Sequence, residues 1–339
     1  MDGANWPARS PRSPLGVPAG LPAAPRCTGV PAGVFAPHRR PPFVLYDAIG
    51  DPTAIDRAWL EDCEGEAVTI APRDAPAFHA YLRLHLPDIL ATEAVPLADR
   101  AWAVHRALLL EVASMLAQGN RGRADHLVPA CRALAGFLRA HFEPDALLRS
   151  LRMDAPHTPV VHAVETAIGT VAVALAHGQR AVDALALLGT AAAFADAGLL
   201  ELPRALRMRH GPLTPVERAA IEHHPERSLR RMQAAGVVSP EAQRAVLYHH
   251  ERWDGRGYPA RLTGGTIPLE ARYIAIADTY SALTVSRRGM PRLDRRDALR
   301  EMASSTGQFD PGLLRILVCL LGNGMAGLPP GDTGRGAAA

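Results

Sequence analysis

Aspartate and histidine residues recur at helical spacing on apolar faces in the C-terminal half of the sequence. Asp196 closes the most apolar run of the chain, and Asp278 lies on the apolar face of a later predicted helix. Between them, at intervals of about one helical hairpin, stand three histidines: His224, His249 and His250. One such histidine alone is usually a core residue satisfied by hydrogen bonds, but several buried charges together are costly unless they are compensated. Because imidazole nitrogens and carboxylate oxygens bind divalent metals, a shared metal site is the simplest common explanation.

Helices must bring these residues together, and a 3.6-residue apolar period predicts helices from residue 99 onward. The expected spans are 98–118, 124–142, 157–177, 182–200, 215–235, 240–251, 269–285, 295–305 and 311–322. Several starts are marked by a capping hydroxyl followed by proline, as at Thr214 and Ser239. The stretch 255–268 is rich in glycine and proline and is therefore expected to be a loop between two helices.

The N-terminal part of the chain has weaker periodicity. Residues 1–41 are rich in proline and alanine, which predicts a disordered tail. Residues 42–150 are expected to form a small α/β or helical module with a helical connector. Its predicted elements are two short strands and a helix, at 43–46, 67–70 and 76–86. Residues 323–339 are expected to be a flexible tail, and the whole fold is expected to be mainly α.

The composition narrows the class of protein. The net charge of +3 gives no electrostatic case for nucleic-acid binding. Four cysteines without a CxxC pair fit a reducing cytoplasm, and the cytoplasm is the predicted location. The apolar run 184–195 is too short to span a bilayer, which indicates a buried core helix and no membrane association. All 37 basic residues are arginine, so any role that needs a compact ammonium must be filled by guanidinium or left empty.

Residues 249–259 have the sequence HHERWDGRGYP, which resembles the long and specific signature of the HD-GYP family. Other segments resemble family motifs in the same order along the chain: Leu213-Thr214 with His224-Pro225, 267–272 with Asp278, and Phe309-Asp310-Pro311. His162 lies where the first helix of the HD core would begin. The resemblance covers roughly 150–322 and, more weakly, 42–150.

The resemblance implies that residues 151–322 form a helical HD bundle that hydrolyses cyclic di-GMP with two divalent metals, iron or manganese. It implies that Asp196 is the catalytic carboxylate that bridges the two metals. The ligands of one metal would then be His224, His249 and His250, and those of the other would include His162 and Asp278.

The glycine-rich loop with Tyr258 is implied to shape the substrate pocket, and it leaves room for a protein partner. Glu251 and Asp254 in the same motif are expected to cap the loop or to support the ligands from behind. Glu251 is expected to orient a ligating imidazole. The helices within 98–142 are compatible with a packing unit or with a homodimer.

The sequence departs from the family pattern in its "HDxGK" segment, where Ala195 replaces the histidine and Leu199 the lysine. Ser281 stands where an acidic residue is usual, and the expected Arg-Pro-Tyr is replaced at 287–290. Loss of one electrostatic donor to a transition state costs on the order of 100-fold in rate. The arginines considered for contacting the phosphate instead are Arg209, Arg287 and Arg288.

Three functions follow from these observations. The intact 249–259 segment favours a cyclic di-GMP phosphodiesterase, weakened by the losses. Ala195 and Leu199 favour an inactive module that binds cyclic di-GMP or a protein partner. A phosphohydrolase acting on another nucleotide is the third alternative, against which the long signature argues.

Overall fold

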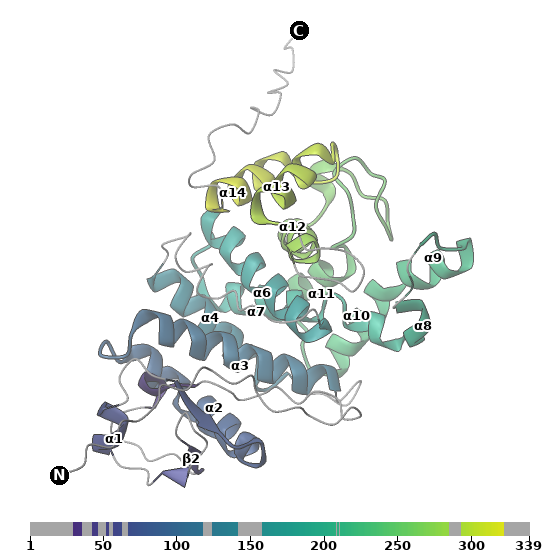
Figure 1. Ribbon diagram of the computed structural model, residues 1–339. Coiled ribbons are helices and arrows are strands. Elements are labelled where there is room, and N and C mark those ends of the chain that lie inside the picture. Colours follow the sequence, from purple (N-terminus) through teal and green to yellow (C-terminus); the bar gives the residue numbers. More distant parts are fainter. Residues whose placement is uncertain are drawn as a thin grey trace, which may run out of the picture.

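The computed structural model describes residues 30–35, 43–46, 52–53, 57–62, 67–117, 124–141, 158–207, 209, 211–284 and 293–321. In this part of the chain helices dominate, and Figure 1 shows them stacked above a small sheet at the N-terminal end. The prediction of a mainly α fold is therefore confirmed. The tail predicted at 323–339 lies outside the described residues.

A four-stranded antiparallel sheet opens the described chain, with the strand order β1-β4-β2-β3. Its strands are β1 (Val30–Pro31), β2 (Leu45–Tyr46), β3 (Pro52–Thr53) and β4 (Ala67–Ile70). The strand expected at 67–70 is confirmed, and the one expected at 43–46 is shorter. The sheet borders α2 through Phe43, whose ring centroid is 5.7 Å from that of Phe78.

The prediction of a disordered tail over residues 1–41 is wrong for residues 30–35. These residues form β1 and the 3₁₀ turn η1 (Ala32–Val34), and they bury Val30, Val34 and Phe35. Proline is tolerated on an edge strand, where its missing amide has no neighbouring strand to bond, so the proline-rich composition did not prevent pairing. The rest of that predicted tail lies outside the described residues.

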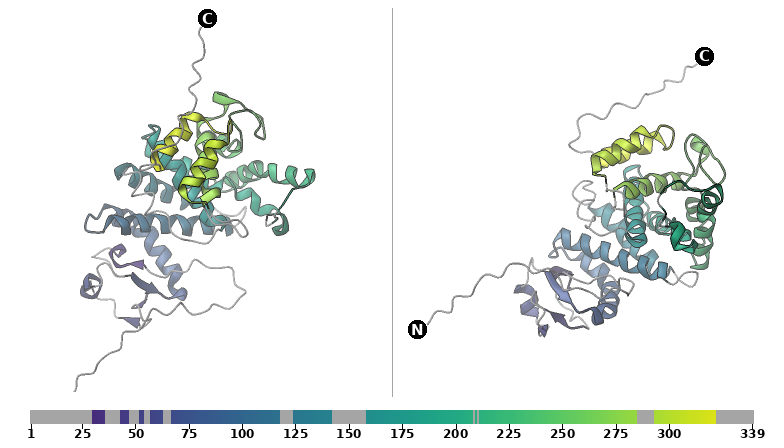
Figure 2. Two further views of the ribbon diagram at one scale, coloured as in Figure 1. Left: turned by 45° about the horizontal axis from the view of Figure 1, so that its top comes forward. Right: turned by 45° about the vertical axis from the view of Figure 1, so that its right-hand side comes forward.

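A short helix, α1 (Arg57–Asp62), lies between β3 and β4, and three helices follow the sheet and lead to the C-terminal bundle: α2 (Ala75–Ala91), α3 (Leu97–Ala117) and α4 (Leu127–Ala140). The helix expected at 76–86 thus extends to Ala91. The long helix α3 lies between the sheet and the bundle (Figures 1 and 2). On one side Arg83 donates to Glu111 of α3 at 2.8 Å, and on the other Arg231 donates to the carbonyl of Leu116 at 3.3 Å.

The C-terminal bundle consists of α6 (Pro159–Ala176), α7 (Val182–Phe194), α8 (Arg204–Arg207), α9 (Pro215–Glu222), α10 (His224–Ala234), α11 (Pro240–Leu247), α12 (Leu269–Thr284), α13 (Arg295–Ser304) and α14 (Pro311–Leu321). Short 3₁₀ turns join them at η4 (Ala197–Glu201) and η5 (Gly264–Thr266). The predicted caps at Thr214 and Ser239 are confirmed, since each hydroxyl accepts an amide of the first turn.

Helices α6, α7 and α12 form the centre of the bundle. Small residues let them approach closely: a Cβ added to Gly169 would lie 3.1 Å from that of Ala277. Two segments, α6 and Val182–Glu201, are long and apolar enough to cross a membrane, yet 67% of each is buried inside the protein. The prediction that 184–195 is a buried core helix is therefore confirmed.

Three predicted helices are interrupted or end early. The helix expected at 215–235 is two helices, α9 and α10, separated at His223, because Pro225 in the first turn of α10 cannot continue the hydrogen bonding of α9. The helix expected at 240–251 ends at Leu247, and the one expected at 182–200 ends at Phe194 and continues as η4. Each of these ends falls just before a candidate metal ligand.

Candidate metal centre

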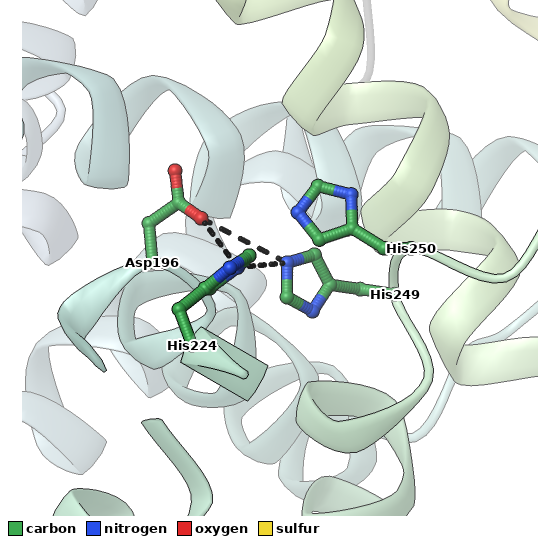
Figure 3. A group of neighbouring side chains, drawn as sticks. All are labelled: Asp196, His224, His249 and His250. Carbon is green, nitrogen blue, oxygen red and sulfur yellow. Dashed lines mark hydrogen bonds and ion pairs between the residues drawn. The ribbon is translucent and has the colours of Figure 1, made fainter. Parts of the chain in front are cut away.

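Ends of helices, and not their inward faces, place four of the candidate ligands. Asp196 lies two residues after the end of α7, at the start of η4, and His224 is the first residue of α10. His249 and His250 lie in the turn after α11. The expectation that the histidines project from helix faces is therefore wrong for His249 and His250, but Figure 3 shows all four side chains converging on one point.

Close packing of η4 on α10 brings Asp196 and His224 together. Gly198 lies so near the carbonyl of His224 that any Cβ there would collide with backbone. The amide of Gly198 donates to the hydroxyl of Ser228 at 2.8 Å, and that hydroxyl donates to the carbonyl of Ala195 at 2.6 Å. A glycine at position 198 is thus required by this contact.

The first ligand group consists of Asp196, His224, His249 and His250, whose ligand atoms all lie within 4.8 Å of one another. The Oδ1 of Asp196 is 3.2 Å from Nε2 of His224 and 3.8 Å from Nε2 of His249. The two Nε2 atoms are themselves 3.4 Å apart. His224 and His249 are almost fully buried.

The contacts of the Nδ1 atoms of His224 and His249 show which ring nitrogen carries the proton and therefore what the Nε2 atoms can bind. Nδ1 of His224 is 2.8 Å from the carbonyl of Ile221, and Nδ1 of His249 is 2.7 Å from the carbonyl of Val246. A carbonyl only accepts hydrogen bonds, so each Nδ1 carries the proton of the neutral ring. Both Nε2 atoms then present lone pairs to each other and to a carboxylate, a set of acceptors that only a cation can satisfy. The donor set fits a divalent metal.

The second ligand group consists of His162 on α6, Asp196, and Asp278 on α12. Nε2 of His162 lies 2.8 Å from Oδ1 of Asp278 and 3.3 Å from Oδ2 of Asp196. Nδ1 of His162 lies 3.0 Å from the hydroxyl of Ser281. Asp196 therefore turns one oxygen to each group, which is the arrangement of a bridging carboxylate.

The charged groups of the centre shift one another's pKa values. Burial lowers the pKa of His162, but hydrogen bonds to Asp196 and Asp278 outweigh it and raise the pKa to about 10. Burial raises the pKa of Asp196, but the adjoining rings of His162, His224 and His249 bring it well below its usual range. Burial, followed by the neighbouring His249 and His224, lowers the pKa of His250 to about 3.

The second group has fewer imidazoles than the first. Ala195, which stands directly before Asp196 where the family pattern has a histidine, is fully buried. Leu199, on the next turn of η4, is a half-buried hydrocarbon. The group thus presents one nitrogen and two carboxylates, against three nitrogens and one carboxylate in the first group.

A cavity of about 290 Å³ opens beside the first group and is lined by His249, His250 and Tyr258 among others. The ring of Tyr258 lies 4.9 Å from that of His250. Its position is fixed by Gly257, which packs against the backbone of residues 250–252 so tightly that no side chain fits. The predicted pocket-lining role of Tyr258 therefore agrees with its place in the structure.

The two carboxylates of the glycine-rich loop hold the loop itself. Glu251 accepts the amides of Ala260 at 2.6 Å and Leu262 at 2.9 Å, so it caps the loop, which is one of the two roles expected of it. Asp254 pairs with Arg252 at 2.9 Å and accepts the amide of Arg256 at 3.0 Å, as expected for a loop cap. The imidazoles are oriented by backbone carbonyls instead, because the helix ends supply unpaired acceptors.

The arginines that were expected to contact the substrate are not found at the cavity in the described part of the chain. Arg209 pairs with Glu217 in the capping box of α9 and is not among the residues that line the cavity. Arg287 and Arg288 lie outside the described residues. Arg218 and Arg256 do line the cavity, and nothing in the motif or the apolar period distinguished them from other surface arginines.

Comparison with known proteins agrees with this geometry. A family model described as HD domain matches residues 160–313. The chain is 28% identical over 284 residues to a cyclic di-GMP phosphodiesterase of Pseudomonas aeruginosa, covering 80% of this chain and 66% of that protein. It is 33% identical over 141 residues to a cyclic di-GMP phosphodiesterase of Vibrio cholerae, covering 40% of this chain and 29% of that one. The chain thus spans only part of each relative's length.

A solved structure shares the fold. An HDG"Y"P protein from Bdellovibrio bacteriovorus superposes with a TM-score of 0.60, covering 84% of this chain and 96% of that one, at 16% identity. At this identity the likeness establishes the arrangement of the helices and nothing about the reaction.

Proposed function

We propose that the protein is a metal-dependent phosphodiesterase that hydrolyses cyclic di-GMP, because a family model described as HD domain matches residues 160–313 and a similar protein is a cyclic di-GMP phosphodiesterase. The observation that carries the proposal is the position of Asp196, whose two oxygens face two adjoining ligand groups. The first of these groups reaches the cavity through His249 and His250. One carboxylate shared by two cation sites suits the attack of water on a phosphodiester, in which charge builds up on several oxygens at once.

Divalent metals, which we propose to be iron or manganese, would supply Lewis acidity at the phosphate and lower the pKa of water. The chain's own part is to hold them through the residues of the two groups: His162, Asp196, His224, His249, His250 and Asp278. Iron and manganese both accept the mixture of imidazole and carboxylate that these residues offer.

Tyr258 has a further role at the cavity. Burial, followed by the nearby carboxylates of Asp196 and Asp278, raises the pKa of its phenol. The phenol therefore stays protonated and able to donate a hydrogen bond to a phosphate oxygen. Its ring also lies beside that of His250, and both residues line the cavity.

Activity is proposed to be weakened by two positions. Ala195 removes an imidazole from the second group, and Leu199 removes an ammonium that would face the phosphate. Either loss reduces the stabilisation of negative charge in the transition state. These same positions support a second candidate function, an inactive module that binds cyclic di-GMP or a protein partner.

The deciding experiment incubates manganese- or iron-loaded protein with cyclic di-GMP and separates the products by chromatography. Asp196→Ala is the control, because it removes a ligand from both groups at once. Product from the wild type alone supports the phosphodiesterase. No product, combined with measurable cyclic di-GMP affinity, supports the binding module. Turnover of a different nucleotide in a substrate panel, with none of cyclic di-GMP, would favour the third alternative.

We propose a cytoplasmic location, which the free thiols of Cys131 and Cys319 support, since free thiols suit a reducing compartment. Binding of a protein partner at the glycine-rich loop stays a prediction. So does a homodimer formed through the helices within 98–142.

A further inference from the structure

The cavity beside the metal centre has more cationic than anionic groups on its walls. Three guanidinium groups line it, from Arg218, Arg252 and Arg256. Two carboxylates oppose them, from Glu222 and Glu251. The lining therefore carries a net positive charge, which suits an anionic ligand.

Local contacts engage two of these five charges. Arg252 donates to both oxygens of Asp254, at 3.1 and 2.9 Å, and to Gln308 at 3.1 Å. Glu251 is occupied by two backbone amides. Neither group is therefore available to a ligand without breaking the loop that holds Tyr258.

Arg218 and Arg256 differ from Arg252 in this respect. Arg218 is on α9 and Arg256 is in the glycine-rich loop, and both side chains are exposed. Within the part of the chain that the structure describes, neither guanidinium has a hydrogen-bond or ion-pair partner, although Arg256 lowers the pKa of Asp254 through space. Two uncommitted guanidinium groups from separate segments thus line the cavity that reaches His249 and His250.

We infer that Arg218 and Arg256 bind the phosphates of the cyclic dinucleotide at the cavity and supply part of the positive charge that is absent at Leu199. The inference rests on the proposed function. A guanidinium group presents several donors to phosphate oxygens, so each arginine can bind one phosphate in two places. Both arise from the cavity wall and not from η4 beside Asp196, so they bind and position substrate and are not catalytic residues.

The test compares Arg218→Ala, Arg256→Ala and the double variant with the wild type as full-length, manganese-loaded protein. Arg230→Ala is the matched control, because Arg230 is an exposed arginine of the same domain that does not line the cavity. The measurements are the Kd for cyclic di-GMP by equilibrium titration, KM and kcat by chromatography, and metal content. Lysine at each position tests whether charge alone suffices.

Each alanine is expected to raise Kd and KM about 3- to 10-fold, and the double variant about 10- to 100-fold, with kcat and metal content unchanged. Lysine is expected to restore only part of the affinity, and Arg230→Ala to have no effect. Wild-type binding that persists unchanged in the double variant would overturn the inference alone. A wild type that neither binds nor cleaves cyclic di-GMP would overturn the proposed function as well.

Discussion

The group of Asp196, His224, His249 and His250 and the group of His162, Asp196 and Asp278 meet at one carboxylate but are built from different parts of helices. Ligands of the first group stand at helix ends, where His224 and His249 each donate Nδ1–H to a backbone carbonyl. Apart from the shared Asp196, the second group has His162 in the first turn of α6 and Asp278 within α12, and Nδ1 of His162 lies beside a side chain, that of Ser281.

This difference predicts how the two groups respond to change. The bonds that orient His224 and His249 end on backbone carbonyls, which are present whatever the residue type, and the first group has three imidazoles and one carboxylate. The second group depends on side chains at positions 195 and 281, and both differ from the pattern that the HD-GYP resemblance implies. We therefore expect the first group to bind metal tightly and the second to bind it weakly.

The largest effect is expected from His249→Ala, which removes a nitrogen ligand from the first group. Loss of a residue that only supports a ligand costs about 10- to 100-fold in metal affinity, so loss of the ligand should cost at least 100-fold. Metal content after desalting and the rate of cyclic di-GMP hydrolysis should both fall toward background. His223→Ala is the matched control, because this adjacent histidine is 69% exposed. Retained metal in His249→Ala would contradict the assignment of His249 as a metal ligand of the first group.

The next largest effect is expected from a substitution that adds a metal ligand to the second group. By the HD-GYP pattern, Ala195→His restores the histidine that precedes Asp196, and it should raise the affinity for a second ion about 10- to 100-fold. Metal analysis at a fixed free-ion concentration should then move from near one ion per chain toward two, and turnover should rise. Ala195→Leu adds a side chain without a donor and should leave the stoichiometry unchanged. Equal stoichiometry in Ala195→His and Ala195→Leu would contradict a vacancy at this position.

The stability of the metal-free protein should depend on pH through His162 of the second group. The pKa of His162 is raised to about 10 by Asp196 and Asp278, despite burial, from 6.5 in the unfolded chain. This proton stabilises the fold fully below pH 6.5, and its contribution is lost as pH rises toward 10. Between pH 7 and 9 the free energy of unfolding in excess chelator should fall by about 2 kcal/mol.

The measurement is the urea midpoint as a function of pH in His162→Asn and in the wild type. A fall of equal size in both proteins would show that the proton is not held by His162. Addition of metal should remove the difference, since a bound ion replaces the proton between the carboxylates.

The smallest effect is expected from Ser281→Ala. The hydroxyl lies 3.0 Å from Nδ1 of His162, and its removal leaves that buried ring nitrogen without this partner. Affinity for the second ion should fall by about 10-fold or less, with the first ion unaffected. Sequential metal titration separates the two. Equal weakening of both ions would mean that Ser281 supports the whole centre and not one side of it.

The sequence predicted the presence of these ligands better than their position. Asp278 and His162 stand within helices, where apolar periodicity applies, and the face of Asp278 was assigned correctly from it. His224 and His249 lie just beyond helix ends that the periodicity overran, because Pro225 and the turn after Leu247 stop hydrogen bonding without interrupting the apolar pattern. The short strand at Val30 escaped prediction because its pairing with Val68 is a long-range contact that composition does not encode.

The bonds from His224 to Ile221 and from His249 to Val246 have a consequence for the energetics of loading the centre. Each ring is hydrogen-bonded to the carbonyl three residues before it, so neither ring can rotate away without breaking a bond to its own main chain. Most of the conformational entropy of arranging these ligands is thus lost during folding and not during metal uptake. An ion entering this side of the centre meets rings that are already in place, and its binding requires little rearrangement of the surrounding helices.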